Sequence, residues 1–215
     1  MFDYFISLGW YCGTAASMSK YGLRSHSGPF DWYFSDLKGV LECMNNNFED
    51  FLDKRNLEVM ENKPKEFKDR KYGFYYNHEI NTCFEDDFSE ICNKYRRRIE
   101  VFKEMIVRST CFIRTVRNEA EWRFIQNNRF YIDAVVKKYN PENEVIYVVS
   151  RKRVDIENPE FPFFRVEAAY DGSSYEALSS LFDDNLKLQK FCISSLEESR
   201  RTQNLYFNLQ NKSCK

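Results

Sequence analysis

The stretch that decides the fold is FISLGWYCGTAASMSKYGLR, residues 5–24, near the start of the chain. Residues 3–8 are apolar enough to predict a short β-strand, and residues 13–21 have the composition of a helix. Gly9 and then Cys12 lie between the two. The pattern predicts a strand that turns directly into a helix, with a thiol at the turn.

Cys12 is the first candidate for chemistry because of this position. The N–H groups of a first helical turn have no partner inside the helix, and the helix dipole is positive at that end. Both effects favour a thiolate, so we expect the pKa of the Cys12 thiol to be lowered. The backbone N–H groups of Cys12 and Gly13 are then candidate donors to an oxyanion. The alternative is that Cys12 is an ordinary buried cysteine among apolar residues.

Strand-like and helix-like segments alternate along the rest of the chain. Apolar residues recur at steps of three and four over residues 88–107, which predicts an amphipathic helix. Compact apolar segments at 111–116 and 144–150 are typical of strands, with a long helix predicted over 119–139 between them. Strands separated by helices favour a mostly parallel sheet with helices on both faces, in a single α/β domain covering residues 1–215.

The remaining segments give weaker signals. A helix is predicted to begin near Ser35 or Asp36 and to bury apolar residues as far as Leu52. The charge-rich residues 53–71 are predicted to form a short helix or an exposed connection. The other predictions are a strand that ends in a loop over 71–80, a strand over 161–169, a helix over 175–198, and a frayed tail or last strand over about 205–215.

The composition of this 215-residue chain limits its partners. It has 32 Lys and Arg against 33 Asp and Glu, for a net charge of -1, so there is no overall field to hold nucleic acid. No segment reaches the roughly 18–20 consecutive apolar residues of a membrane span, and Asp3 interrupts the place of a secretory signal. We therefore expect no nucleic-acid partner, no membrane span and a cytoplasmic location.

Cysteine usage and the absence of nucleotide motifs limit the chemistry. The seven cysteines are an odd number without a CxxC pair, which favours reduced thiols over a disulfide framework. Four of them fall at core-like positions of predicted helices and strands and are expected to be buried: Cys43, Cys92, Cys111 and Cys192. No HExxH, GxGxxG or GxxxxGK[ST] motif is present, so we expect neither a metal nor a cofactor.

Several motifs together resemble a known family. They are SLGWYC at 7–12, KYGLR followed by SGPFDW at 27–32, the histidine of YYNHEI, KYRRRIEVF and CFIRTV, over roughly residues 4–150. In these motifs the chain resembles the DUF1796 family of bacterial and viral proteins, which are described as papain-like cysteine peptidases. The resemblance implies a Cys/His-dependent hydrolase or transferase, with relatives found among cell-surface polysaccharide genes. It also implies an α+β, papain-like fold as the alternative to a doubly wound sheet.

The chain has only two histidines, which narrows the choice of catalytic base. A cysteine hydrolase needs a base beside the thiol and a polar group to orient the imidazole. His78 follows a predicted strand and is the histidine to which the resemblance points, while His26, in a run of small polar residues, is the alternative. Asp31 is the candidate orienting carboxylate, unless it only caps a turn, and Glu79 is its substitute. The resemblance implies an aromatic residue next, where this chain has Ile80.

Aromatic and basic side chains near these motifs are candidates for binding a substrate or an anion. The candidates are Trp10, Trp32, Arg24, Arg98 and Arg114. Arg98 belongs to a basic cluster at residues 94–98 that spreads over more than half of its helix, a pattern also typical of a solvated face. Within that cluster, Arg98 is the member best able to turn toward a cleft.

Three functions are consistent with the sequence. The first is a cysteine-dependent hydrolase, a peptidase or an amide or ester acyl-transfer enzyme, which uses Cys12 and His78 on a peptide, acyl or glycan-related small substrate. The second, suggested by the resemblance, is a transferase-type enzyme of cell-surface polysaccharide biosynthesis whose arginines hold phosphate. The third is a non-catalytic interaction protein that uses its 20 Phe and 14 Tyr for protein contacts. The distance from the Cys12 sulfur to the nearest imidazole nitrogen distinguishes them.

Overall fold

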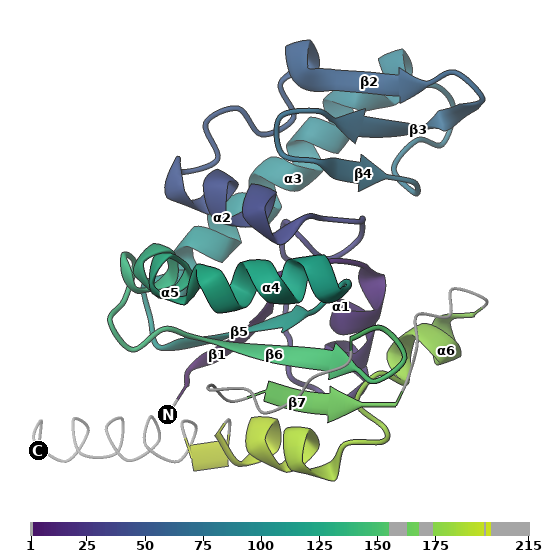
Figure 1. The fold of residues 1–215 in the computed structure, drawn as a ribbon. Coiled ribbons are helices and arrows are strands. Elements are labelled where there is room, and N and C mark those ends of the chain that lie inside the picture. Colours follow the sequence, from purple (N-terminus) through teal and green to yellow (C-terminus); the bar gives the residue numbers. More distant parts are fainter. Residues whose placement is uncertain (1, 155–162, 168–173, 196, 199–215) are drawn as a thin grey trace, which may run out of the picture.

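The computed structural model describes residues 2–154, 163–167, 174–195 and 197–198. Its central feature is a four-stranded sheet of β1 (Tyr4–Ser7), β5 (Thr110–Thr115), β6 (Glu144–Ser150) and β7 (Phe163–Val166), in that spatial order. All three neighbouring pairs are parallel, so the carboxyl ends of the strands lie at one edge of the sheet (Figure 1). The predicted α/β fold with a mostly parallel sheet is confirmed.

Side chains of the central strands alternate between two apolar layers. In β5, Cys111 and Ile113 belong to one layer, and Phe112 belongs to the other. The first layer is covered by α1 (Cys12–Lys20), against which α6 (Tyr175–Ser179) packs. The second is covered by α2 (Leu37–Asn45), α3 (Phe84–Ile106), α4 (Glu119–Asn127) and α5 (Arg129–Lys137) (Figure 1). Helices thus cover both faces, as a parallel sheet requires.

The chain between β1 and β5 contains a second, antiparallel sheet. Its strands are β2 (Leu57–Met60), β3 (Lys63–Asp69) and β4 (Phe74–Tyr76). The predicted helix or connection over 53–71 is therefore wrong, apart from a short 3-10 helix at Lys54–Asn56. The sequence does not indicate these strands because most of their side chains are exposed. Only Phe67 and Asp69 of β3 are buried, so the alternation that marks a strand in a sequence is absent here.

One aromatic cluster connects the two sheets. Phe102 of α3 packs against Phe112 of the parallel sheet, with ring centroids 6.2 Å apart, and against Phe30, at 5.7 Å. Phe30 in turn contacts Phe74 of β4, at 6.1 Å. Each large apolar side chain that is fully buried contributes roughly 1.5–3 kcal/mol to folding. The second sheet is therefore held on the first by a shared core.

Predicted helices are interrupted at three places. The helix predicted over 119–139 breaks at Asn128, whose φ of -122° and ψ of 21° are not helical, and so becomes α4 and α5. In the helix predicted over 175–198, α6 is short, and helical structure resumes at residues 186–195. The helix predicted near residue 36 is α2, but it ends before Phe48, which is left-handed with a φ of 66°.

The described cysteines are free thiols of differing exposure. Cys43, Cys111 and Cys192 are buried, as predicted, whereas Cys92 is half-buried and Cys83 is exposed. In the described part of the chain, none of the helices combines the length and the apolar character needed to cross a membrane. The tail predicted over about 205–215 and both ends of the strand predicted over 161–169 lie outside the described residues.

Candidate active site

The chain passes from β1 into α1 through a sharp turn at Gly9 and Trp10. Both residues are left-handed, with φ angles of 77° and 80°. A Cβ on Gly9 would lie 2.5 Å from the carbonyl oxygen of Phe30 and 2.6 Å from Ser35 Oγ, so only glycine fits. The same conformation costs about 1–3 kcal/mol at Trp10 and must be held by its surroundings. The turn places Cys12 at the first position of α1.

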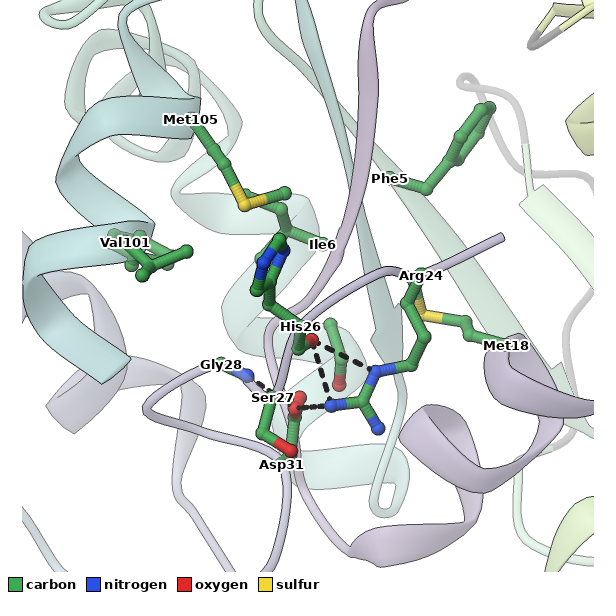
Figure 2. Close-up of a pocket in the computed structure, with 12 residues that line it drawn as sticks. Phe5, Ile6, Met18, Arg24, His26, Ser27, Gly28, Asp31, Val101 and Met105 are labelled. Atoms are coloured by element: carbon green, nitrogen blue, oxygen red, sulfur yellow. Dashed lines mark hydrogen bonds and ion pairs between the residues drawn. The ribbon is translucent and has the colours of Figure 1, made fainter. Parts of the chain in front are cut away.

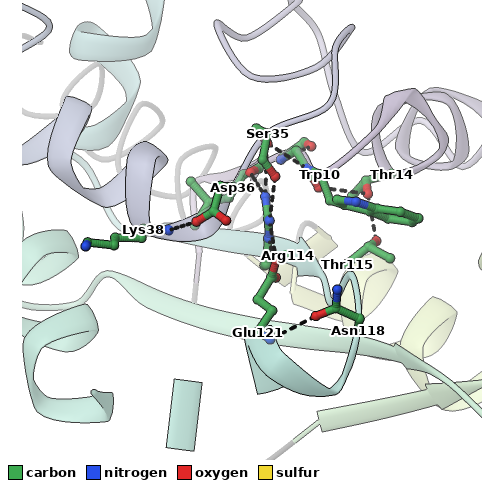
Figure 3. Close-up of polar contacts among 12 residues, drawn as sticks. Trp10, Thr14, Ser35, Asp36, Lys38, Arg114, Thr115, Asn118 and Glu121 are labelled. Carbon is green, nitrogen blue, oxygen red and sulfur yellow. Dashed lines mark hydrogen bonds and ion pairs between the residues drawn. The ribbon is translucent and has the colours of Figure 1, made fainter. Parts of the chain in front are cut away.

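Ser35 holds the turn in place. The Trp10 N–H donates to Ser35 Oγ at 2.9 Å, and the Ser35 N–H donates to the Trp10 carbonyl oxygen at 3.0 Å (Figure 3). Ser35 follows directly on SGPFDWYF, residues 27–34. The two motifs that stand out in the sequence, SLGWYC and SGPFDW, therefore lie side by side in the fold.

Cys12 is half-buried at the N-terminus of α1. The N-cap residue, Tyr11, makes no side-chain capping hydrogen bond. Burial raises the pKa of the Cys12 thiol above its ordinary value, and a hydrogen bond with its own backbone N–H lowers it less. The expected lowering of this pKa is therefore wrong for the free protein, because desolvation outweighs the helix start. A thiolate at neutral pH needs a base.

Gly13 lies under the aromatic ring of Tyr11. A Cβ at this position would be 2.2 Å from the nearest ring atom, and Gly13 is buried. The ring of Tyr11 also packs on that of Trp10, with centroids 4.4 Å apart. The Tyr11 ring thus covers residue 13 and leaves no room there for any side chain.

Asp31 is only 2% exposed and lies in a small pocket with Arg24 and His26 (Figure 2). Its carboxylate accepts hydrogen bonds from the Arg24 guanidinium and the Gly28 N–H. Burial raises the pKa of Asp31 to about 6, against the lowering effect of Arg24 and of the Gly28 hydrogen bond. The described hydrogen bonds of the Asp31 carboxylate are thus made with Arg24 and with the Gly28 N–H, and not with a histidine.

Both histidines are exposed. His26 lies beside Asp31 in this pocket, but its Nδ1 makes a hydrogen bond with Ser25 Oγ, at 2.8 Å. His78 lies between β4 and α3. Across residues 2–154, no hydrogen bond or ion pair joins either imidazole to Cys12 or Asp31. Pairing of Cys12 with His78 therefore stays a prediction.

Glu79, the alternative candidate for orienting the imidazole, also has partners other than a histidine. It is buried, and its carboxylate accepts from the Lys94 ammonium and from the Tyr95 hydroxyl, the latter at 2.8 Å. These contacts attach the loop after β4 to α3. They explain why Glu79 is buried while the neighbouring His78 is exposed.

Three of the predicted binding residues, Arg24, Trp32 and Arg98, are linked to Asp31 directly or through one another. The Arg24 guanidinium lies 5.4 Å from the ring centroid of Trp32 while it is paired with Asp31. Arg98 lies 4.9 Å over the Tyr95 ring and lowers the pKa of Asp31 through its charge. Its Nη1 is buried and has no hydrogen-bond partner among the described residues. Arg24 thus binds the Asp31 carboxylate directly, Trp32 lies against Arg24, and Arg98 acts on the carboxylate through its charge.

Arg114 is not at a binding surface, which corrects the expectation for this residue. It is 0% exposed, and its Nε and Nη2 donate to the Glu121 carboxylate at 2.9 and 2.8 Å (Figure 3). Its other N–H groups donate to the Leu8 carbonyl oxygen and to Ser35 Oγ and O, at 2.8, 3.1 and 2.8 Å. All five donors are used inside the protein. Arg114 therefore fastens the two motif loops to the end of β5 instead of binding an anion.

A large cleft lies between the carboxyl edge of the parallel sheet and the second sheet, with a volume of about 920 Å³. We call it the basic cleft, because six basic side chains line it: Lys38, Lys68, Arg70, Lys71, Arg117 and Arg153. Only two acidic side chains do, Asp36 and Glu42. Sequence reasoning missed the cleft because these residues are scattered from position 38 to position 153. Trp10 is the one predicted binding residue on its wall.

Comparison with known proteins places the chain in a family. A family profile described as "Putative papain-like cysteine peptidase (DUF1796)" matches residues 3–140. An uncharacterized protein of Acanthamoeba polyphaga mimivirus is 30% identical over 120 residues, which cover 46% of this chain and 54% of that protein. The match thus spans about half the length of this relative. No solved structure matches the chain. Since the profile covers more than half of its length, the chain belongs to the DUF1796 family.

Proposed function

We propose that the protein is a cysteine-dependent hydrolase of amide or ester bonds whose nucleophile is Cys12. The observation that carries the proposal is the position of this thiol. It is the first residue of α1, at the carboxyl edge of the parallel sheet, where α/β proteins place their functional groups. It is also partly exposed, whereas Cys43, Cys111 and Cys192 are buried. Membership of a family described as cysteine peptidases supports the same class of chemistry.

The reaction begins with removal of the thiol proton by a histidine. The thiolate then attacks the carbonyl carbon of the substrate, and the C–N or C–O bond breaks as the leaving group takes the proton from the imidazolium. Water hydrolyses the resulting thioester, which releases the carboxylic acid and restores the thiol. The first-turn N–H groups of Cys12 and Gly13 are the proposed donors to the oxyanion.

We assign the base to His78. Support comes from its exposure, from its place in a loop after β4, and from its presence in the YYNHEI motif. His26 is the alternative, since it lies in the pocket with Asp31. Orientation of an imidazole by Asp31 is part of the proposal, although the described partners of this carboxylate are Arg24 and Gly28.

The nucleophile is tested with p-nitrophenyl acetate, a simple activated ester. We expect acetylation of the peptide that contains Cys12, detected by mass spectrometry, together with release of p-nitrophenol. Cys12→Ala should lose both signals. Cys83→Ala is the matched control, because Cys83 also lies at a helix start and is more exposed. Equal turnover by Cys12→Ala and the unmodified protein would exclude Cys12.

The base is tested with His78→Ala and His26→Ala in the same assay. If His78 takes the proton, its removal should slow acylation at pH 7 by about 10²-fold or more, the usual contribution of a general base. The defect should shrink at high pH, where the thiol ionises unaided. His26→Ala should leave the rate unchanged. The reverse ranking would transfer the role to His26.

A further inference from the structure

The basic cleft concentrates positive charge in a chain whose net charge is -1. Lys71 is paired with Asp50, and Arg70 lies 3.7 Å from Glu58. Lys38, Lys68 and Arg117 take part in no ion pair with any described residue. Like charges facing one another in a concave site repel, so this arrangement raises the free energy of the empty cleft and favours an anion.

The cations converge from separate parts of the fold. Lys38 comes from the first turn of α2, Lys68 from β3, and Arg117 and Arg153 from the segments that follow β5 and β6. The last two therefore lie at the carboxyl ends of parallel strands, the usual ligand site of such sheets. Lys38, Lys68 and Arg117 are all exposed. Packing of the core therefore does not require these three side chains to lie near one another.

A row of aromatic rings lines the same cleft. The Arg153 guanidinium lies 4.6 Å from the ring of Trp10, whose centroid is 6.4 Å from that of Phe34. Phe34 is 6.3 Å from Tyr75, and the two exchange backbone hydrogen bonds of 3.0 and 2.9 Å. The row is thus fixed by backbone contacts as well as by Ser35. Rings of this kind offer flat apolar surface beside the cations.

We propose that the basic cleft binds an organic phosphate, a small molecule that carries one or two phosphate groups on a ring-containing body. A phosphate monoester carries a charge of about -1.5 to -2 at pH 7 and has three acceptor oxygens, so several separate cations can share it. A single carboxylate carries only one charge on two oxygens. The ring lies against Phe34 and Tyr75. A volume of about 920 Å³ suits a molecule of nucleotide size and is far larger than one inorganic ion needs. Nucleotides and sugar phosphates are two sources of this chemistry.

The test is calorimetric titration of the full chain at low salt with four probes: uridine diphosphate, glucose 1-phosphate, inorganic pyrophosphate and uncharged uridine. We expect the organic phosphates to bind, with affinity that falls as salt rises, and uridine not to bind. The tighter of the two organic phosphates identifies the source. Equal affinity for pyrophosphate would overturn the part of the proposal that concerns the aromatic row, and absence of binding by all four would overturn it entirely.

Charge reversal locates the site. Lys68→Glu and Arg117→Glu should each weaken the organic phosphate by about ten-fold or more. Lys65→Glu is the matched control, because Lys65 is exposed on the same strand but does not line the cleft. Loss of affinity in this control to the same extent would show a general charge effect and overturn the assignment. Cys12→Ala should bind normally, so this result is independent of the proposed hydrolase chemistry.

Discussion

Arg114 and Glu121 form a buried bidentate ion pair, with N–O distances of 2.9 and 2.8 Å and the arginine 0% exposed. Arg114→Met should lower the free energy of unfolding by about 3–5 kcal/mol, because it leaves the Glu121 carboxylate buried without its partner. Chemical denaturation measures this change. Arg123→Met is the control, since the Arg123–Glu119 pair is exposed and should cost no more than about 1 kcal/mol. Equal effects of the two variants would contradict the role given to Arg114.

The turn that leads into α1 gives a second prediction. Gly9→Ala should destabilise the protein by at least about 3 kcal/mol, since it adds an atom against Phe30 and Ser35 to an already left-handed backbone. Gly22→Ala separates the two causes. Gly22 is also left-handed, with a φ of 66°, but a Cβ added there would meet nothing within 4 Å, so we expect a cost of only about 1 kcal/mol. Thermal and chemical unfolding of both variants check the difference.

Alkylation of Cys12 by iodoacetamide should require a high pH in the free protein. Burial raises the pKa of this thiol, so its thiolate fraction at neutral pH is smaller than that of an exposed cysteine in a short capped peptide. Mass spectrometry of the Cys12 peptide over a pH series should place the midpoint of alkylation above that of a short capped cysteine peptide measured in parallel. A midpoint below it would mean that a nearby cation or imidazole stabilises the thiolate.

Asp31 makes stability depend on pH in a definite direction. Its pKa in the folded state is about 6, above the roughly 3.9 of an unfolded aspartate. The folded state therefore binds the proton more tightly, and this residue contributes stability at low pH that is lost as pH rises through about 6. Relative to Asp31→Asn, the unmodified protein should gain about 2 kcal/mol between pH 7 and 4.5. The absence of any gain between pH 7 and 4.5 would show instead that Arg24 keeps Asp31 ionised over this range.

Much of the fold is predictable because its signals are local. The strand at β1, the turn at Gly9 and the helix at Cys12 follow from neighbouring residues, and the apolar segment of β6 matches a strand that is buried on both faces. The hairpin of β2 and β3 is not predictable in this way, since its side chains are mostly exposed and its charges resemble those of a loop.

The site is less predictable, because its contacts join distant residues. In the sequence, nothing distinguishes Arg114 from an arginine on the surface. Only the fold shows that its guanidinium N–H groups donate to Glu121 and Ser35. Within the cluster at residues 94–98, Arg96 is exposed and donates to Asn93, whereas Arg98 lies over the Tyr95 ring and acts on Asp31 through its charge. The basic cleft draws single residues from several elements, so nothing in the neighbourhood of Lys68 or Arg117 indicates it.

Trp10 links the shape of the basic cleft to the geometry at Cys12. It lines the cleft and also forms the left-handed turn that precedes the first residue of α1. A residue that replaces Trp10 would have to adopt the left-handed backbone of the turn and also contact the ligand. The backbone therefore constrains this wall of the cleft. The part of the cleft that is built on strand β3 is mostly exposed and has no left-handed residue. Redesign or natural divergence of ligand preference in this fold should therefore be concentrated in the antiparallel sheet, while the thiol and its turn stay unchanged.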